Sequence, residues 1–315
     1  MSRIVATGSY LPEKILTNKE LIERTGIDSS DEWITQRTGI HQRHFALGHE
    51  TVSDLAIQAA KDLLKQMDAE IVQEIQLILV ATMSSRLPTP SVASQVQRGL
   101  GIEQALAFDI SGACSGFIMA LEVAEKLTRE QSSGYTLMIG AEKMSEILNF
   151  EDRGTSILFG DGAGAVLIKH DGEGLKNYQS ELISLPDPKD SIHVPAEENP
   201  KGQMSMDGRE VFNFVLRQVI PSLSNFIQDY AKDFDYLISH QANYRFIEIL
   251  AKKLKVSLDK IPANIDKMAN TSAGSIPILL DQMVKEERIF LNSTQEVVLV
   301  GYGAGLAWGQ IRLTI

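Results

Sequence analysis

Apolar runs alternate along this chain with amphipathic segments, and their order predicts an α/β fold. Residues 77–82 are almost wholly apolar, as in a buried strand, whereas the apolar residues of 51–64 recur every three or four positions, as on one face of a helix. Residues 157–169 form a predicted glycine turn that leads into an apolar strand. The same reasoning predicts further strands at 4–7, 105–110 and 136–140 and further helices at 17–22, 91–100 and 113–128.

The order of predicted elements then repeats, which indicates a duplicated unit. Residues 171–208 are rich in proline and acidic residues and are predicted to form an irregular connection. Beyond it, helices are predicted at 211–230, 244–254 and 272–284, and strands at 235–239, 261–265 and 296–300. The chain therefore divides into an N-terminal half over 1–170, a connection over 171–208 and a C-terminal half over 209–315, each half a βαβαβ unit that ends in a glycine turn and a strand.

The only cysteine of the protein lies where a predicted strand turns into a predicted helix. Cys114 follows Gly112-Ala113 and precedes an almost wholly apolar segment, which places it in the first turn of a buried helix. The unpaired amides and the positive end of the helix dipole at that point favour a thiolate, so we expect a lowered pKa and a nucleophile. A lone cysteine in an apolar segment is, however, also ordinary core.

Two further side chains have matching positions in the duplicated pattern. Overlaying the halves puts Cys114 opposite the region of Asn270, and puts His240 at the end of the strand that matches 77–82. Strand ends of two related α/β units can converge on one site. A cysteine can carry an acyl group, while the N–H groups of a neutral histidine and of an asparagine can stabilise an oxyanion or an enolate.

Composition narrows the classes of protein that fit this pattern. The chain has 315 residues, one cysteine and a formal net charge of −11, so it has no internal disulfide and no excess of cations for general nucleic-acid binding. No apolar run approaches the roughly 20 residues that span a bilayer, and the amino terminus has no signal-peptide pattern. The six histidines show no metal-ligand spacing. We therefore expect a cytoplasmic protein with no metal, no membrane contact and no nucleic-acid partner.

Three other readings of Cys114 remain open at this point. Residues 112–116 fit the G-x-C-x-G turn of a cysteine-using α/β-hydrolase, although such folds are not duplicated. The order cysteine, histidine, asparagine is also that of papain-like proteases, which usually carry disulfides. Cys114 as a core residue of a non-enzymatic scaffold is the third alternative.

Several motifs in the right order make the whole chain resemble the β-ketoacyl-acyl-carrier-protein synthase III family, whose fold is that of thiolase. The resemblance is carried by residues 31–34, 37–40, 113–116, 152–153, 158–164, 240–243, 270–273 and 303–309. It implies two duplicated βαβαβ halves in a five-layer α-β-α-β-α arrangement. It also implies a homodimer and a cytoplasmic enzyme without a cofactor.

The resemblance implies a condensing reaction in two stages. A short acyl group passes from acetyl-CoA or another short acyl-CoA to Cys114, and malonyl-acyl carrier protein then loses carbon dioxide. His240 and Asn270 are expected to hold the enolate oxygen, and the backbone amides of Cys114 and Gly305 are expected to form the oxyanion hole. The product is a 3-ketoacyl-carrier protein that starts type II fatty-acid synthesis. The runner-up is a related acyltransferase or condensing enzyme of secondary metabolism.

The resemblance also implies binding residues around this centre. Trp33 and Arg153 are expected to sandwich the CoA adenine and Arg37 to meet its phosphates. Contacts with CoA and pantetheine are further implied for Arg209, Phe212 and Asn243, docking of the acidic carrier protein for Arg245, Lys252 and Lys253, and an acyl-pocket loop for Leu87 and Thr89.

Three positions depart from the family pattern. Ala304 replaces the middle glycine of a turn that is commonly Gly-Gly-Gly, Arg209 replaces a frequent asparagine, and Thr89 replaces a larger residue. A Cβ at Ala304 can restrict the turn. A small Thr89 predicts a primer pocket that is at least not smaller than acetyl requires.

Overall fold

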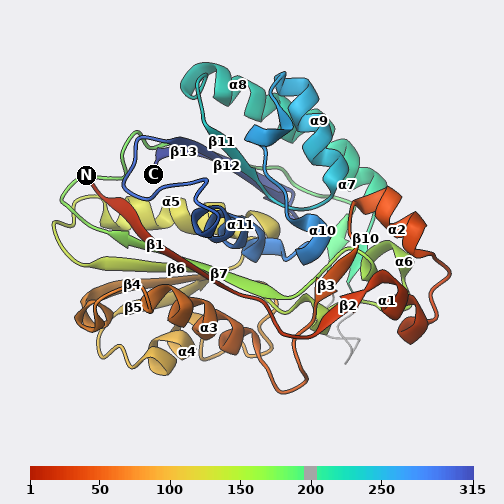
Figure 1. Ribbon diagram of the computed structural model, residues 1–315, viewed down its shortest axis with the longest axis horizontal. Coiled ribbons are helices and arrows are strands. Elements are labelled where there is room, and N and C mark those ends of the chain that lie inside the picture. Colours follow the sequence, from red (N-terminus) through yellow and green to blue (C-terminus); the bar gives the residue numbers. More distant parts are fainter. Residues whose placement is uncertain (195–203) are drawn as a thin grey trace.

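The computed structural model describes residues 1–194 and 204–315, and arranges them in five alternating layers (Figure 1). Two sheets enclose a central layer of two helices, α5 (Gly116–Thr128) and α11 (Ser275–Lys285). The outer layers are α3 (Val52–Leu64) and α4 (Val92–Leu100) on one side, and α7 (Gly208–Phe214), α8 (Ile220–Tyr230) and α9 (Tyr244–Leu254) on the other. This is the α-β-α-β-α order that the resemblance implies.

The first sheet is built from the N-terminal half, in the order β1-β7-β6-β4-β5. Its strands are β1 (Arg3–Tyr10), β4 (Ile75–Ala81), β5 (Leu106–Ile110), β6 (Tyr135–Glu142) and β7 (Gly162–Lys169). β4 pairs parallel with β5 and β6, and β7 pairs antiparallel with β6 and β1. Every residue of β6 is buried because helices cover both faces of the sheet. β5 is an edge strand and remains partly exposed.

The second sheet repeats this pairing in the order β11-β12-β13-β8. Its strands are β11 (Tyr236–Ser239), β12 (Glu296–Gly303), β13 (Ala307–Thr314) and β8 (Gln179–Ser184). β11 and β12 are parallel, as β4 and β6 are, and β13 pairs antiparallel with β12 and β8, as β7 does with β6 and β1. The duplication predicted from the sequence is therefore present in the strand pairing.

Two predicted segments differ from the structure. The connection expected over 171–208 contains β8, whose alternately exposed residues look like a loop because β8 lies at the edge of its sheet. Part of that connection, 195–203, lies outside the described residues. The strand expected at 261–265 is absent, and the backbone N–H of Asn264 donates instead to Gln241 Oε1 at 3.2 Å. Pro262 supplies no N–H for a strand at this point.

Shorter elements connect the layers and surround one end of them. Capping boxes at Thr17 and Thr51 begin α1 (Asn18–Thr25) and α3. A π-helical turn, Val215–Val219, joins α7 to α8. The remaining elements are β2 (Ile15–Thr17), α1 (Asn18–Thr25), α2 (Asp31–Thr38), β3 (Gln42–His44), η1 (Ala69–Glu74), η2 (Ala113–Ser115), η3 (Met144–Glu146), α6 (Arg153–Ser156), β9 (Ile192–His193), β10 (Ser205–Met206), η5 (Leu258–Lys260), α10 (Ile265–Met268) and η6 (Ser272–Gly274).

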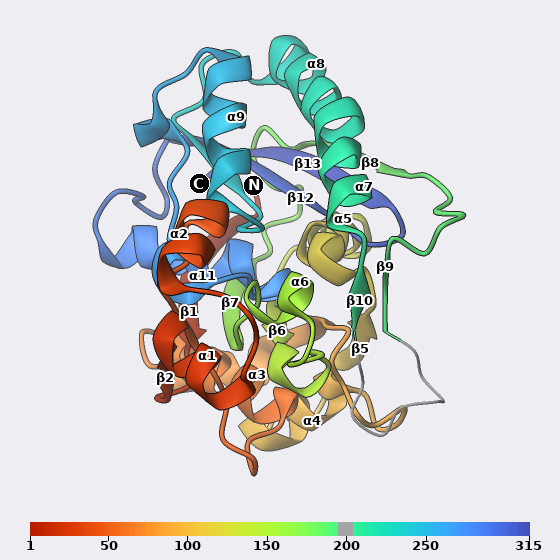
Figure 2. The same cartoon turned by 90° about the vertical axis from the view of Figure 1, so that its right-hand side faces the viewer.

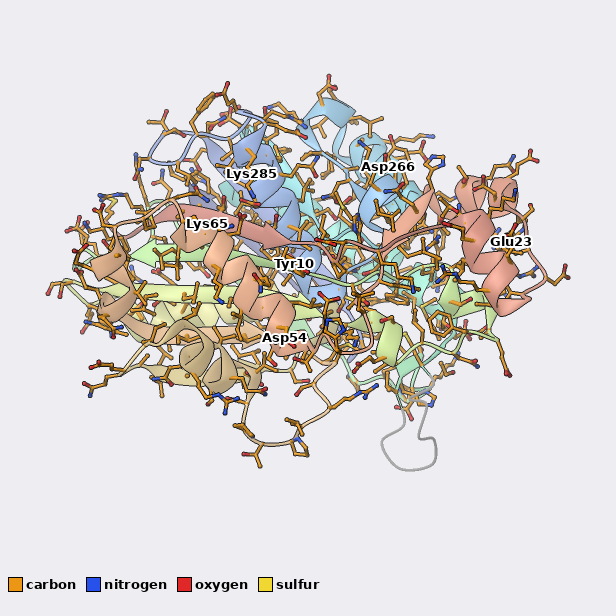
Figure 3. The ribbon with its side chains drawn as sticks, turned by 60° about the horizontal axis from the view of Figure 1, so that its bottom comes forward. Tyr10, Glu23, Asp54, Lys65, Asp266 and Lys285 are labelled. Carbon is orange, nitrogen blue, oxygen red and sulfur yellow. The ribbon has the colours of Figure 1, made fainter. Side chains whose placement is uncertain are left out.

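The central helices pack against both sheets, and this determines where the two halves meet. Phe117 and Ile118 of α5 and Ile276 and Leu279 of α11 belong to one core with strands of both sheets. At the far end of α11, Lys285, labelled in Figure 3, binds Asp62 of α3 at 2.7 Å. At the opposite ends of these helices, the turns that begin them, η2 before α5 and η6 before α11, pack against each other between the sheets. Within the described residues, no helix is long and apolar enough to cross a membrane.

Candidate active site

A cavity of about 610 Å³ opens where the two halves meet. Its walls include Cys114, His240 and Asn270, which the sequence predicted to act together. Helices α2, α6, α7 and α9 contribute the residues nearer the surface, and Figure 2 shows these four helices on the face turned toward the viewer.

Cys114 lies in the 3₁₀ turn that begins the central helix α5. The preceding Ala113 has φ +44°, a strained conformation for a residue with a Cβ, and such strain is concentrated at functional sites. Gly303 packs so closely on the cysteine that a Cβ there would lie 2.9 Å from Cys114 Cβ. The sulfur thus has a fixed position between the halves.

Burial governs the acidity of this thiol. Loss of solvation raises the pKa of Cys114 to about 12, against a smaller lowering by the Ser272 side chain. The lowered pKa expected from the helix start is therefore wrong, because desolvation dominates and the negative charge of Glu142 raises the pKa of the thiol further. The resting site holds a thiol, and this thiol needs a proton acceptor before it can attack.

His240 follows the last residue of β11 and is buried in the cavity wall. Burial lowers the pKa of His240 to about 3, so the imidazole is neutral at physiological pH, as predicted. Its Nδ1 lies 2.7 Å from Ser275 Oγ, which also lies 2.9 Å from the carbonyl oxygen of Ser272. A serine hydroxyl has one proton. The Ser275 hydroxyl can donate it to Ser272 O or to Nδ1, but not to both at once. When the hydroxyl turns to Nδ1, the proton of His240 resides on Nε2, which is then the donor to a substrate.

The side-chain amide of Asn270 has a fixed orientation. Its Oδ1 accepts a hydrogen bond from the backbone N–H of Ser272 at 2.8 Å, which leaves the NH₂ group as the free end. The backbone of Asn270 is bonded to the segment before β7, through Asn270 N to Leu158 O and Gly160 N to Asn270 O. A neutral imidazole and an oriented amide therefore share the cavity with the thiol, an arrangement able to stabilise negative charge on a thioester oxygen.

Trp33, Arg37 and Arg153, which the resemblance implies for binding CoA, lie at the entrance of the cavity. The Arg153 guanidinium lies 4.5 Å from the centre of the Trp33 ring, and that of Arg37 lies 6.0 Å from it. Arg153 is also bound to Asp28 O at 2.7 Å. An adenine between Trp33 and Arg153 needs about 7–8 Å, two layers of van der Waals contact, so the pair has to open.

The remaining predicted entrance residues also reach the cavity. Arg209 and Phe212 come from α7, and Phe212 stacks on Phe246 with 5.3 Å between ring centres. Asn243 caps α9 and donates from Nδ2 to Arg37 O at 3.1 Å. Arg245, also on α9, lines the cavity as well.

Five predicted residues do not line the cavity. Gly305 is exposed, and Gly303 and Ala304 occupy the cavity wall in its place. The oxyanion amide at Gly305 stays a prediction, and the backbone N–H of Ala304, in the wall beside it, is a second candidate. The other four, Leu87, Thr89, Lys252 and Lys253, are exposed on the surface of this chain. Within the described ranges, no three metal-ligating side chains come together.

The structure adds cavity residues that sequence reasoning missed. Four methionines line it, Met83, Met144, Met204 and Met206. The last two belong to the segment predicted as an irregular connection, where the only signal was their two-residue spacing. Methionine side chains are flexible and adapt to different apolar ligands.

Cys114, His240 and Asn270, contributed by both halves, form the floor of the cavity. This floor and the fold assign the chain to the condensing enzymes of the thiolase fold, which are acyltransferases. A family model described as 3-oxoacyl-[acyl-carrier-protein (ACP)] synthase III matches residues 108–185, and the model of its C-terminal part matches residues 230–315. The chain belongs to this family, as the sequence resemblance predicted.

Individual relatives span the whole chain. The beta-ketoacyl-[acyl-carrier-protein] synthase III of Enterococcus faecalis is 42% identical, and that of Streptococcus gordonii is 40% identical, over 100% of this chain and 99% of each relative. The crystal structure of the 3-oxoacyl-[acyl-carrier-protein] synthase III from Aquifex aeolicus has a TM-score of 0.89 and 37% identity over 100% of both chains. A priming β-ketosynthase from the R1128 polyketide pathway has a TM-score of 0.89 and 30% identity, over 100% of this chain and 96% of that one.

Proposed function

We propose that this chain is the initiating condensing enzyme of type II fatty-acid synthesis. It transfers a short acyl group from acyl-CoA to Cys114 and condenses that group with malonyl-acyl carrier protein to give 3-ketoacyl-acyl carrier protein. The observation that carries the proposal is the meeting of Cys114, neutral His240 and oriented Asn270 in one cavity that has aromatic and cationic side chains at its mouth.

In the first stage the sulfur of Cys114 attacks the thioester carbonyl of acyl-CoA. The oxyanion accepts hydrogen bonds from the backbone N–H of Cys114 and from that of Ala304, which lines the cavity where Gly305 does not. The intermediate collapses with loss of CoA as a thiolate, which takes a proton from solvent. The acyl group remains on Cys114.

In the second stage malonyl-acyl carrier protein binds in the same cavity. His240 Nε2–H and Asn270 Nδ2–H hold the thioester oxygen while the carboxylate leaves as carbon dioxide, and they stabilise the resulting enolate. The enolate carbon attacks the acyl group on Cys114, and the sulfur leaves. Every step uses groups of the protein, the substrates and solvent protons, so the proposal includes no cofactor and no metal.

The entrance binds CoA and the pantetheine arm. Trp33 and Arg153 separate to admit the adenine, Arg37 and Arg209 meet phosphates, and Phe212 and Asn243 border the channel. Arg209→Ala is expected to raise the KM for acyl-CoA with little change in kcat, whereas Arg217→Ala, an exposed arginine outside the cavity wall, serves as the matched control. An equal effect of both would remove Arg209 from the site.

The four cavity methionines accommodate primers of different length. We expect acyl-CoAs longer than acetyl to compete with acetyl-CoA for Cys114. In a dimer, Leu87 and Thr89 of one chain border the pocket of the other. Rejection of every primer beyond acetyl in a competition assay would contradict this.

Carrier protein docks on the exposed face of α9 beside the mouth. Arg245, Lys252 and Lys253 supply its positive charge, which complements an acidic partner. Lys252→Glu is expected to raise the KM for malonyl-acyl carrier protein but not for malonyl-CoA. Lys61→Glu, on the opposite outer layer, changes net charge equally and is the control.

The enzyme acts as a cytoplasmic homodimer. The edge strand β5 leaves apolar side chains uncovered, with Leu106 59% exposed, and pairing of two such edges would cover them. Light scattering is expected to give twice the chain mass, and Leu106→Asp to give a monomer. A monomeric native protein would contradict the dimer.

Intact-mass measurement after brief mixing with acetyl-CoA tests the function directly. One added acetyl group, absent from Cys114→Ala and discharged by malonyl-acyl carrier protein with release of carbon dioxide, is the expected result. A native protein that takes no acyl group from any acyl-CoA would overturn the proposal.

The runner-up is a condensing enzyme of secondary metabolism, and the 30% identical polyketide priming enzyme is its support. The relatives at 40–42% identity favour fatty-acid synthesis. Condensation with the carrier protein of a polyketide pathway, faster than with that of fatty-acid synthesis, would favour the runner-up.

A further inference from the structure

A buried carboxylate lies behind the Cys114 thiol, and the two stages above give it no task. Glu142 ends β6 and is fully buried. Its oxygens accept hydrogen bonds from Thr82 Oγ1, Met83 N, Ser84 N, Ser84 Oγ and Ser272 Oγ. All of these groups donate to the carboxylate and favour its ionised form, but burial outweighs them and raises the pKa of Glu142.

Ser272 connects this carboxylate to the reacting sulfur. Its hydroxyl donates to Glu142 Oε1 at 3.2 Å. The turn that begins with Ser272 packs against the turn that holds Cys114, and the Ser272 side chain acts to lower the pKa of the Cys114 thiol. Ser272 has φ +49°, a strained conformation for a residue with a Cβ. Its N–H holds Asn270 Oδ1, and its carbonyl oxygen lies 2.9 Å from Ser275 Oγ, the atom that also contacts His240 Nδ1. Ser272 is therefore linked to all three predicted catalytic side chains: directly to Asn270, through Ser275 to His240, and by its position to Cys114.

The thiol needs an acceptor, and two titratable groups compete for that role. Burial raises the pKa of Cys114 to about 12, so a free thiolate is scarce at neutral pH. The His240 imidazole, with its pKa lowered to about 3, holds a proton poorly. Burial raises the pKa of Glu142 to about 7, so this carboxylate is a much better acceptor near neutrality.

We propose that Glu142 takes the proton of the Cys114 thiol through the Ser272 hydroxyl when the acyl group is loaded, and returns it when the acyl group leaves. This inference rests on the proposed function, since it needs Cys114 to be the acylated residue. In this relay Ser272 is the residue that exchanges a proton with the reacting sulfur, and Glu142 acts through it.

The protons balance over one cycle. During loading, the S–H proton of Cys114 moves to Ser272 Oγ, the Ser272 proton moves to Glu142 Oε1, and the sulfur forms its bond to the acyl carbon. During condensation, the bond between that carbon and the sulfur breaks with both electrons going to sulfur. The proton then returns from Glu142 through Ser272 to the leaving thiolate.

Other charged groups near the relay do not provide this route. His240 and Tyr302 face Cys114 across the cavity, and neither bonds to Glu142. Lys143 follows Glu142 along the chain, but its ammonium lies 2.6 Å from Glu146 Oε1 and binds backbone carbonyls of the segment before α3.

The pH dependence of acyl loading tests the relay. We expect loading of Cys114 by acetyl-CoA in Glu142→Gln to be at least about tenfold slower than native at pH 7. The deficit should close toward pH 9, where hydroxide removes the thiol proton instead. Native loading should level off above about pH 7, where Glu142 is ionised. Ser272→Ala, which keeps the backbone groups that hold Asn270 and Ser275, should show the same loss and the same recovery.

Two controls separate a relay from a structural role. Thr82→Val removes a hydroxyl that donates to the other Glu142 oxygen at the same 3.2 Å, and it should load within about threefold of native. In a Cys114→Ala background, Glu142→Gln should leave malonyl decarboxylation unchanged, because that step needs no thiol. Loading as fast as native at pH 7, or a loss that persists at pH 9, would overturn the relay.

Alkylation of Cys114 by iodoacetamide keeps this test independent of the proposed function, because it needs no acyl-CoA. The same order of rates and the same recovery at high pH are expected for native protein and variants. Equal alkylation of native and Glu142→Gln at pH 7 would overturn the relay even if acyl loading were absent.

Discussion

The floor and the entrance of the cavity differ in how far their side chains are buried and held by hydrogen bonds. At the floor, Cys114, His240 and Asn270 sit in a buried network in which serines fix the histidine and the amide. At the entrance, Trp33 and Phe212 are each 37% exposed and Arg153 lies on the Trp33 ring. A rigid floor can stabilise developing charge, whereas an adaptable entrance can admit and release a large substrate. Substitutions at the floor should therefore change kcat, and those at the entrance should change KM.

The largest effect is expected at Asn270. Asn270→Ala removes an oriented donor from the enolate and should slow decarboxylation of malonyl-acyl carrier protein about 10²–10³-fold. Transfer of acetyl to Cys114 should continue, which mass spectrometry can show. Loss of both steps together would mean that Asn270 supports the fold of the floor instead.

A smaller effect at the floor is expected at Ser275. Without its hydroxyl, the proton of His240 is no longer directed to Nε2, and loss of about one hydrogen bond should slow decarboxylation about tenfold. Ser224→Ala, which removes a serine bond to a backbone carbonyl on α8, is the matched control. A Ser275→Ala rate equal to the control's would refute this role.

At the entrance, Trp33→Ala should weaken binding of acyl-CoA without slowing chemistry. Loss of stacking on the adenine is expected to raise KM about 3–30-fold and to leave kcat nearly unchanged. Phe290→Ala, an exposed aromatic residue away from the cavity, is the control in the same steady-state assay. A fall in kcat with constant KM would assign Trp33 to the floor.

The smallest effect concerns stability and pH. Burial lowers the pKa of His240 from 6.5 to about 3. Between these values the histidine is protonated in the unfolded chain but neutral in the folded protein, so the free energy of unfolding decreases as pH falls below 6.5. Between pH 6.5 and 5, native protein should lose roughly 1.5 kcal/mol more than His240→Gln in urea unfolding. The raised pKa of Glu142 acts in the opposite direction but equally in both proteins. Parallel losses would contradict a neutral, buried His240.

The same contrast explains what the sequence could predict. Cys114 and His240 each stand in a short motif after a strand, and Asn270 stands in a short motif just before a central helix, so local pattern and duplication were enough to bring them together. The sequence could not decide whether the amide of Gly305 or that of Ala304 serves the oxyanion hole, because a turn of small residues does not indicate which N–H faces inward. Glu142 and Ser272 lie 130 positions apart, and only tertiary structure brings their oxygens together. β8 was missed because an edge strand has polar residues where a central strand has apolar ones.

A single-turnover experiment at saturating substrate tests the division between floor and entrance most directly. Labelled acetyl-CoA is mixed with native protein, Trp33→Ala and Asn270→Ala, and acetyl transfer to Cys114 and condensation with malonyl-acyl carrier protein are followed by rapid quench. We predict native rates of both steps for Trp33→Ala, and native acetyl transfer with a condensation step slowed at least a hundredfold for Asn270→Ala. Slow chemistry in Trp33→Ala at saturation, or unimpaired condensation in Asn270→Ala, would contradict the account.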